Sequence, residues 1–305
     1  MKHKEIPGLI ELVESEGLVK AGKLVPEGTS IVEFGCYLGR STQAILDGVN
    51  GGNKGIKFFV FDRFCIPSSD TFSQTLVRHV KGMNLIDKIY VDKEKMLHWE
   101  KVFEELIEPE NNVELKWEKE ELKRFRFHEI ENISLLHIDA PKSYQEFKPI
   151  FYNHFPALVE GARVIFQDFF YHWSSTIIAV VEVMRKKNMI EIIEGRASSL
   201  EVYVSKKIKY EDILSVDLEL EFSEILELLD SSLDYFNTNQ EKIDRPEFFL
   251  PRIKMAKFIH AKSIGKDKVA HDILVELLKK KEFQFIINDF LESIEKDFDI
   301  EYHRR

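Results

Sequence analysis

The sequence predicts an α/β protein with an open, doubly wound, mostly parallel sheet and an all-helical C-terminal extension. Strand-like apolar runs alternate with amphipathic helical stretches up to about residue 206, which is typical of such a sheet. The first run leads through two glycines directly into a helix, at residues 31–42. After residue 206 only helical periodicity remains. We therefore expect one domain at residues 1–206 and a helical extension at residues 207–305.

The expected elements of the first half follow from periodicity and from breaks in it. Residues 57–62 are apolar almost throughout, so this strand should be buried on both faces, as parallel strands are. A glycine-rich stretch at 48–55 interrupts the chain before it. The charged stretch 118–131 indicates a solvated helix or loop. The expected strands are 29–34, 57–62 and 113–117, and the expected helices are 8–24, 41–48, 70–83 and 93–108.

The second half continues the alternation and then becomes helical. The run at 133–139 is apolar and ends in an acid. Further strands are expected at 163–168, 189–193 and 200–205, with helices at 144–158, 174–187, 222–236, 249–262, 267–280 and 284–297. Short helices with apolar stripes are only marginally stable in isolation. Those of the extension should therefore pack on one another, on the first domain or on a second copy, which makes a homo-oligomer possible.

Composition excludes several classes of protein. The chain has 305 residues, 44% of them hydrophobic, and a formal net charge of −10, which does not suggest a nucleic-acid partner. No apolar stretch approaches the roughly 20 residues that span a bilayer, and residues 1–12 do not resemble a signal peptide. Two cysteines, Cys36 and Cys65, fit a reducing compartment. We expect a cytoplasmic protein without membrane partners.

The turn at 31–42 reads Ile-Val-Glu-Phe-Gly-Cys-Tyr-Leu-Gly-Arg-Ser-Thr. It lacks the third glycine of a dinucleotide fingerprint and the Gly-Lys-Ser/Thr of a P-loop, which disfavours NAD and ATP. An acid followed by G-x-x-x-G resembles motif I of the class I S-adenosylmethionine (SAM) methyltransferases, where the loop cradles the methionine part of the cofactor. The alternative is a plain strand–turn–helix connection. The resemblance implies cofactor contacts from Glu33, Gly35, Tyr37, Gly39, Ser41 and Thr42.

Four acids stand at or beside the ends of expected strands: Glu33, Asp62, Asp139 and Asp168. The carboxyl ends of parallel strands form the ligand edge of such a sheet, near the point where the strand order reverses. An acid after the second strand accepts hydrogen bonds from ribose hydroxyls in nucleotide-type sites, which is the expected role of Asp62. We also expect Glu118, just after the third strand, and Asp139 to contact the cofactor.

Two further segments carry a resemblance. Residues 62–67, Asp-Arg-Phe-Cys-Ile-Pro, resemble the D-x-F-x-x-L-P segment of the macrocin O-methyltransferase group, which implies that Arg63 and Phe64 contact the cofactor. The alternative for Phe64 is core packing. Residues 137–169 resemble the I-D-G-D-H-S-Y … F-D-D-Y block of the family called methyltransferase 24. The resemblance covers roughly residues 29–205 and implies a Rossmann-like class I fold that transfers methyl from SAM to an oxygen of a small molecule or sugar.

Departures from that block bear on the chemistry. The second acid of the family is Pro141 here, its histidine is Lys142, and the first of its paired aspartates is Gln167. Relatives that use a divalent cation hold it with carboxylates from these strand ends. Asp139, Gln167 and Asp168 supply oxygen ligands suited to Mg²⁺, but a neutral amide is a weaker ligand, so a metal is not favoured.

Methyl transfer from a sulfonium is an in-line displacement that must align the acceptor and remove its proton. The candidates for this chemistry are Asp139, Lys142 and His172. Lys142 would act as a base or as a cation for an acidic acceptor, and His172 lies in an aromatic loop suited to a sugar or phenol. The alternatives are a surface lysine and an ordinary loop histidine, whereas His137, within an apolar strand, should be a core residue. If the domain is repurposed, the chain would instead be a non-catalytic scaffold for its helical region.

Overall fold

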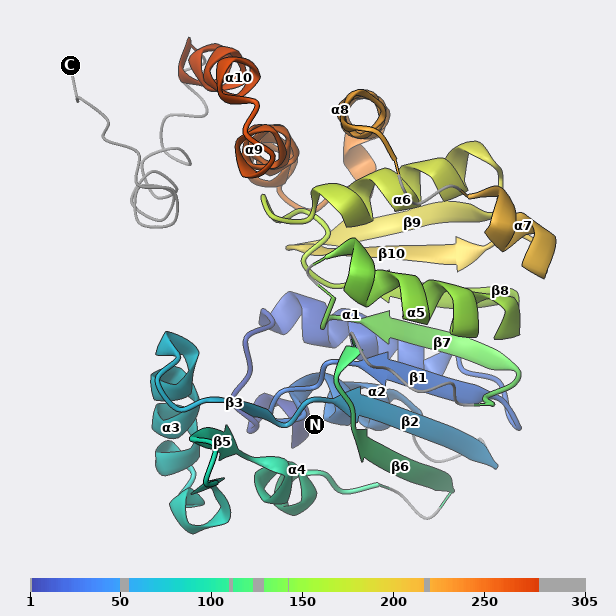
Figure 1. The fold of residues 1–305 in the computed structure, drawn as a ribbon. Helices are drawn as coiled ribbons and strands as arrows, with labels where there is room; N and C mark the ends of the chain where they lie inside the picture. Colours follow the sequence, from blue (N-terminus) through green and yellow to red (C-terminus); the bar gives the residue numbers. More distant parts are fainter. Residues whose placement is uncertain are drawn as a thin grey trace.

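The computed structural model describes residues 2–49, 55–109, 112–122, 129–141, 143–216 and 220–279. A seven-stranded sheet forms its centre, in the order β6-β2-β1-β7-β8-β10-β9 (Figure 1). Its strands are β1 (Ser30–Phe34), β2 (Ile56–Asp62), β6 (Val113–Lys119), β7 (Ile133–Ile138), β8 (Leu158–Phe166), β9 (Ile190–Arg196) and β10 (Ser199–Val204). Five strands run parallel, and only β10 is antiparallel to both of its neighbours. The predicted sheet is confirmed.

The strand order reverses between β1 and β7, which pair in parallel at the centre of the sheet. Chain growth moves outward from β1 to β2 and β6 on one side, and from β7 to β8 and beyond on the other. In folds of this kind, ligands bind in a crevice outside the carboxyl ends of the strands, at the point where the strand order reverses. The sheet topology therefore places the candidate site at the ends of β1, β2, β7 and β8.

Helices cover both faces of the sheet because alternate residues of its strands point to opposite sides. In β1, Ile31 packs in the core that holds α1 (Leu12–Lys23) and α2 (Arg40–Val49), whereas Val32 packs in the core that holds α5 (Tyr144–His154) and α6 (Ser175–Lys186). Short 3-10 turns occur at Lys2–Lys4, Ile86–Lys88, Phe155–Ala157 and Gln240–Lys242. Within the residues described, no helix is long and apolar enough to cross a membrane.

The C-terminal helices are α7 (Tyr210–Ser215), α8 (Phe222–Thr238), α9 (Pro246–Ser263) and α10 (Asp267–Lys279). Helix α8 packs along α6, and its apolar stripe enters the same core as the sheet (Figure 1). The side chains that α8 and α9 add to this core include Ile225, Leu229, Leu233, Phe236, Phe249, Leu250, Ile253 and Ala256. A separate small cluster joins α9 to α10. The extension is therefore partly continuous with the first domain, and a boundary near residue 206 stays a proposal.

Three expectations about single elements are wrong. The stretch 93–108 is not one helix but strand β5 (Met96–His98) followed by α4 (Glu100–Leu106). Strand β5 forms a small sheet with β3 (Cys65–Pro67) and β4 (Tyr90–Val91), beside α3 (Thr71–Gly82). Helix α1 begins at Leu12, and β8 begins at Leu158, because α5 ends at His154. The helix expected at 284–297 lies outside the described residues.

Candidate active site

Asp62 fastens the glycine loop that follows β1. Its Oδ2 atom accepts hydrogen bonds from the amides of Cys36 (2.8 Å) and Tyr37 (3.0 Å), and its Oδ1 atom accepts one from Phe64 (2.8 Å). Burial raises the pKa of the Asp62 carboxyl, and the three amides oppose that rise. An ionised carboxylate has about four acceptor sites. Asp62 thus holds the loop and keeps room for about one further donor.

The two glycines of this loop are needed for reasons within the protein. Gly35 has a φ of +86° and Gly39 a φ of +94°, a region in which side chains are strained. A Cβ atom on Gly35 would lie 2.8 Å from the amide nitrogen of Ala140, and one on Gly39 would lie 2.4 Å from Cδ1 of Ile107. These glycines therefore allow β1, β7 and the segment after α4 to pack closely, and their expected approach to a ligand stays a prediction.

Glu33 does not face the crevice. It is fully buried, its Oε2 accepts a hydrogen bond from the Thr42 hydroxyl at 2.5 Å, and its Oε1 lies 2.9 Å from Nδ1 of His137. Burial alone would lower the pKa of His137, but the hydrogen bond and the charge of Glu33 raise it above its usual value. Glu33 and Thr42 therefore form a buried support beneath the loop, and cofactor contacts from them stay a prediction. The expectation that His137 is a core residue is confirmed, although only its Nδ1 atom and not its Nε2 atom has a hydrogen-bond partner in the described structure.

Of the other residues that are expected to contact the cofactor, some are buried and some are exposed. Phe64 is fully buried against Trp99, Phe103 and Trp117, so it takes the core-packing alternative. Arg63 and Glu118 are exposed, Glu118 opposite Phe61 on the edge strand β6. Ser41 is buried at the start of α2. Arg63 and Glu118 are thus open to a ligand, whereas Phe64 can act only by shaping the wall behind it.

Tyr37 is the loop residue that reaches outward. It has a φ of 54°, and its ring packs against Phe72 on α3. Its hydroxyl lies 3.1 Å from Nδ1 of His79, and its carbonyl accepts a hydrogen bond from the indole of Trp99 at 2.9 Å. Helix α3 and the small sheet therefore form the wall of the crevice on the β2 side, a part of the site that the expected single helix at 93–108 had hidden.

On the other side of the reversal, two half-buried acids follow β7 and β8. The amides of Asp139 and Ala140 both donate to the carbonyl of Phe34, at 2.8 and 2.9 Å, which ties the end of β7 to the end of β1. Asp168 has a φ of 58°, and its carbonyl accepts from Tyr171 and from the Ser174 hydroxyl. Both acids thus sit in tight turns at the expected edge. Lys142 lies outside the described residues.

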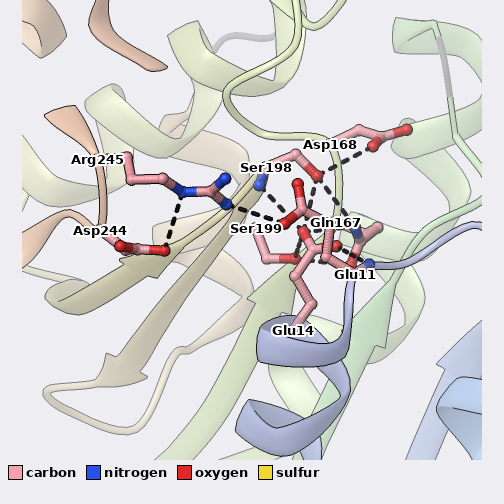
Figure 2. Close-up of polar contacts among 8 residues, drawn as sticks. All are labelled: Glu11, Glu14, Gln167, Asp168, Ser198, Ser199, Asp244 and Arg245. Atoms are coloured by element: carbon pink, nitrogen blue, oxygen red, sulfur yellow. Dashed lines mark hydrogen bonds and ion pairs between the residues drawn. The ribbon is translucent and has the colours of Figure 1, made fainter. Parts of the chain in front are cut away.

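Sequence reasoning missed a buried network beneath Asp168, drawn in Figure 2. Oε1 of Glu14, on α1, accepts from the Ser198 amide (3.0 Å) and from the hydroxyls of Ser198 (2.7 Å) and Ser199 (2.8 Å). It also accepts from Nε2 of Gln167 at 2.9 Å. Ser198 lies in the β9–β10 turn and Ser199 begins β10, 184 and 185 residues away along the chain. No local pattern distinguishes Glu14 from a surface acid of an amphipathic helix, so only the fold reveals it.

The contacts of Gln167 within this network bear on whether its side chain could bind a divalent cation. The carbonyl oxygen of Gln167 accepts the Ser199 hydroxyl at 2.6 Å while its amide donates to Glu14. Both ends of the side chain are therefore engaged within the protein, and Gln167 does not fit the role of a metal ligand beside Asp139 and Asp168. Among the described residues, no group of three His, Cys, Asp or Glu side chains is arranged to hold a metal ion.

His172 lies in the aromatic loop Phe169–Trp173, which follows β8. It is 8% exposed. Burial, and then the positive charge of Arg252 on α9, lower the pKa of His172 to about 3. The imidazole is thus neutral at physiological pH but a weak base, since base strength falls with the pKa of the conjugate acid. This argues against His172 as the group that removes a proton from an acceptor.

Comparisons with known proteins give one family match and several distant structural matches. Residues 32–169 match the model of the Methyltransf_24 family, described as a methyltransferase domain. The fold is similar to the solved structure of the O-methyltransferase NovP, with 19% identity over 65% of this chain and 82% of that one and a TM-score of 0.42. An O-methyltransferase from Bacillus cereus in complex with SAH is 14% identical over 66% and 85% of the two chains, with a TM-score of 0.35. No curated protein gives a significant match.

The family match begins in β1 and ends in the aromatic loop after β8, so it spans the glycine loop, Asp62, Asp139 and Asp168. These are the parts that the strand reversal brings to one edge of the sheet. Residues 32–169 of this chain are therefore similar to the methyltransferase domain that the Methyltransf_24 model describes.

Proposed function

We propose that this protein transfers a methyl group from SAM to a hydroxyl oxygen of a small molecule that carries a sugar or phenol ring. The observation that carries the proposal is the placement of Asp139 and Asp168 at the ends of neighbouring strands, beside the aromatic loop. Carboxylates orient hydroxyl groups and accept their protons, and aromatic side chains pack against rings. The O-methyltransferase titles of the similar structures, one of them a TDP-rhamnose 3′-O-methyltransferase, agree with this acceptor class.

The polar groups on the β2 side of the crevice fit SAM. Asp62 keeps capacity for a ribose hydroxyl, because three amides use only three of the roughly four acceptor sites of its carboxylate. The loop after β1 and the start of α2 contain Gly35, Tyr37, Gly39 and Ser41, which are proposed to contact the cofactor. Exposed Arg63 and Glu118 are proposed to border the adenosine part. When bound, SAM supplies the electrophilic methyl group.

The protein's own part in the reaction is to hold the acceptor hydroxyl and take its proton. We propose Asp139 for this step among the described residues, because its half-buried carboxylate follows β7 at the edge of the sheet where ligands bind, whereas His172 is buried. Lys142, outside the described residues, stays a prediction as a second base or as a cation for an acidic acceptor. The engaged side chain of Gln167 supports a reaction that needs no divalent metal.

Two wider expectations belong with this proposal. The free thiols of Cys36 and Cys65 support a reducing location such as the cytoplasm. Acceptors are proposed to be small molecules, with no nucleic-acid or membrane partner, and self-association through the helical extension stays possible.

Calorimetric titration with SAM and S-adenosylhomocysteine, followed by transfer of a labelled methyl group to matched phenols, anilines and sugar alcohols, tests the function. We expect micromolar cofactor binding and methylation of the hydroxyl compounds alone, unaffected by EDTA. Asp139→Asn should lower kcat far more than it lowers SAM affinity.

Binding without turnover on any hydroxyl compound would overturn the acceptor class. Absence of SAM binding would instead support the non-catalytic scaffold. Loss of activity on chelation would show that a metal takes part despite the engaged Gln167.

A further inference from the structure

We infer that Arg252, on helix α9 of the C-terminal extension, is a positioning residue for the acceptor because it fixes the aromatic loop Phe169–Trp173 at the end of β8. The inference rests on the proposed function, since that loop borders the proposed acceptor position. It gives the extension a role in the active site in addition to its role in the core. Three sets of contacts carry it.

The inner side of the loop is clamped by the extension. Phe170 is fully buried, with ring centroids 5.2 Å from Phe236 on α8 and 5.9 Å from Phe249 on α9. On its other side a Cβ atom on Gly195 of β9 would lie 2.7 Å from the Phe170 ring. Phe170 therefore fills a slot between β9 and the C-terminal helices, and without those helices one wall of the slot is missing.

The outer side of the loop is held by Arg252 itself. The guanidinium carbon lies 4.5 Å from the ring centroid of Tyr171 and 4.4 Å from that of Phe248, so the cation sits between a loop ring and a helix ring. It also forms a side-chain hydrogen bond with Tyr171. Tyr171 in turn stacks on Trp173, with centroids 4.2 Å apart. The contact thus passes from α9 through Tyr171 to the 40% exposed ring of Trp173.

Charge adds to this fixation. Asp168, directly before the loop, and Glu11, directly before α1, both act electrostatically on Arg252 and favour its charged form. Nearby, Arg245 at the start of α9 forms an ion pair with Glu11 at 2.9 Å (Figure 2). The amide of Asp244 donates to the carbonyl of Gly195. The start of α9 is therefore anchored to the rim of the crevice at two further points, which holds Arg252 over the loop.

A planar guanidinium can stack on two rings and donate a hydrogen bond at the same time, whereas an ammonium is a compact, strongly hydrated point charge. Lysine at this position should therefore restore only part of the effect. Lys257, on the same helix, offers a matched control, because it pairs with Asp230 of α8 at 2.6 Å and does not contact the loop in the described structure. Arg252→Met and Lys257→Met each remove one cation from α9, but only the first releases Tyr171.

Two readouts test the inference. The chain has three tryptophans, so 5-fluorotryptophan labelling gives three fluorine resonances, of which Trp173→Phe identifies one. In Arg252→Met we expect the Trp173 resonance to shift and broaden while those of Trp99 and Trp117 stay in place. With a hydroxyl acceptor from the panel, KM for the acceptor should rise at least tenfold and the Kd for SAM should change less than twofold. Arg252→Lys should lie between the wild type and Arg252→Met, and Lys257→Met should resemble the wild type.

An unchanged Trp173 resonance in folded Arg252→Met would overturn the inference, as would an equal rise in acceptor KM for Lys257→Met. If no compound in the panel is methylated by the wild type, the proposed acceptor class fails, yet the fluorine spectrum still decides whether Arg252 positions the loop.

Discussion

The two sides of the crevice are built in different ways. On the β2 side, the loop that follows β1 is held by Asp62 through amides at most 26 residues away. On the β8 side, Asp168 and its loop are held by α1, by the β9–β10 turn and by α9, through contacts that span up to 185 residues. The proposed cofactor side is thus built from a local stretch of chain. The proposed acceptor side is assembled from segments that lie far apart in the sequence.

Removal of the C-terminal extension should have the largest effect, because the β8 side of the crevice and the core beneath it depend on the helices of the extension. A chain that ends at residue 206 loses Leu229, Phe236, Phe249 and Ile253, all fully buried in the core shared with the sheet. At about 1.5–3 kcal/mol for each buried side chain, the loss is about 6–12 kcal/mol, similar to the whole stability of a typical domain. We expect this chain not to fold, as judged by circular dichroism and light scattering.

The control for that truncation is a chain that ends at Lys279, which retains every side chain of the three described cores. We expect it to fold. A stable truncated domain at residue 206 that still binds SAM would show that the boundary between two independent units does lie there.

Asp62→Ala should affect the β2 side of the crevice, where SAM is proposed to bind. Three backbone amides would lose their common acceptor, and the loss should weaken SAM binding by about 3 kcal/mol, or roughly a hundredfold. Calorimetry measures this, with exposed Asp87→Ala as the control. Unaltered SAM affinity in a folded Asp62→Ala protein would remove Asp62 from the cofactor side.

Glu14→Ala should affect the other side. Four donors would lose the Oε1 atom that they share, so we expect the free energy of unfolding to fall by on the order of 2 kcal/mol, with a rise in acceptor KM. Glu16→Ala, on the same helix but paired with Lys4 at the surface, should change it by less than about 0.5 kcal/mol. Equal effects of the two substitutions in urea unfolding would contradict the buried network.

The smallest effect concerns the pH dependence of stability. The pKa of His172 is lowered to about 3 in the folded protein, below its value of about 6.5 in an unfolded chain. As the pH falls below 6.5 the unfolded state binds a proton that the folded state does not, so stability is lost. Between pH 6.5 and 5.5 this histidine should account for about 1 kcal/mol of that loss.

His172→Asn should remove that contribution, while exposed His271→Asn should keep it. Urea unfolding at several pH values measures both. A pH dependence that is the same in His172→Asn and in the wild type would mean that His172 is not buried as a neutral group.

The sequence by itself determined the sheet, the order of its elements and the position of the cofactor loop. Strand–turn–helix patterns, buried apolar runs and glycines are local signals, because the backbone conformations and hydrogen bonds that they satisfy lie within a short stretch of chain. Gly35 and Gly39 are recognised for this reason, and the structure adds that both allow close packing, against Ala140 and Ile107. Local patterns were weakest where strands were short, as in β3, β4 and β5.

Only the tertiary structure decided which polar residues face the crevice. Glu33 and Asp62 look alike in sequence, each an acid in or at the end of an apolar strand, yet Glu33 is fully buried against Thr42 and His137. Glu14 and Arg252 have the spacing of ordinary helix residues. Their partners lie far away along the chain, so their roles depend on how helices and sheet pack together, which no short stretch of sequence encodes.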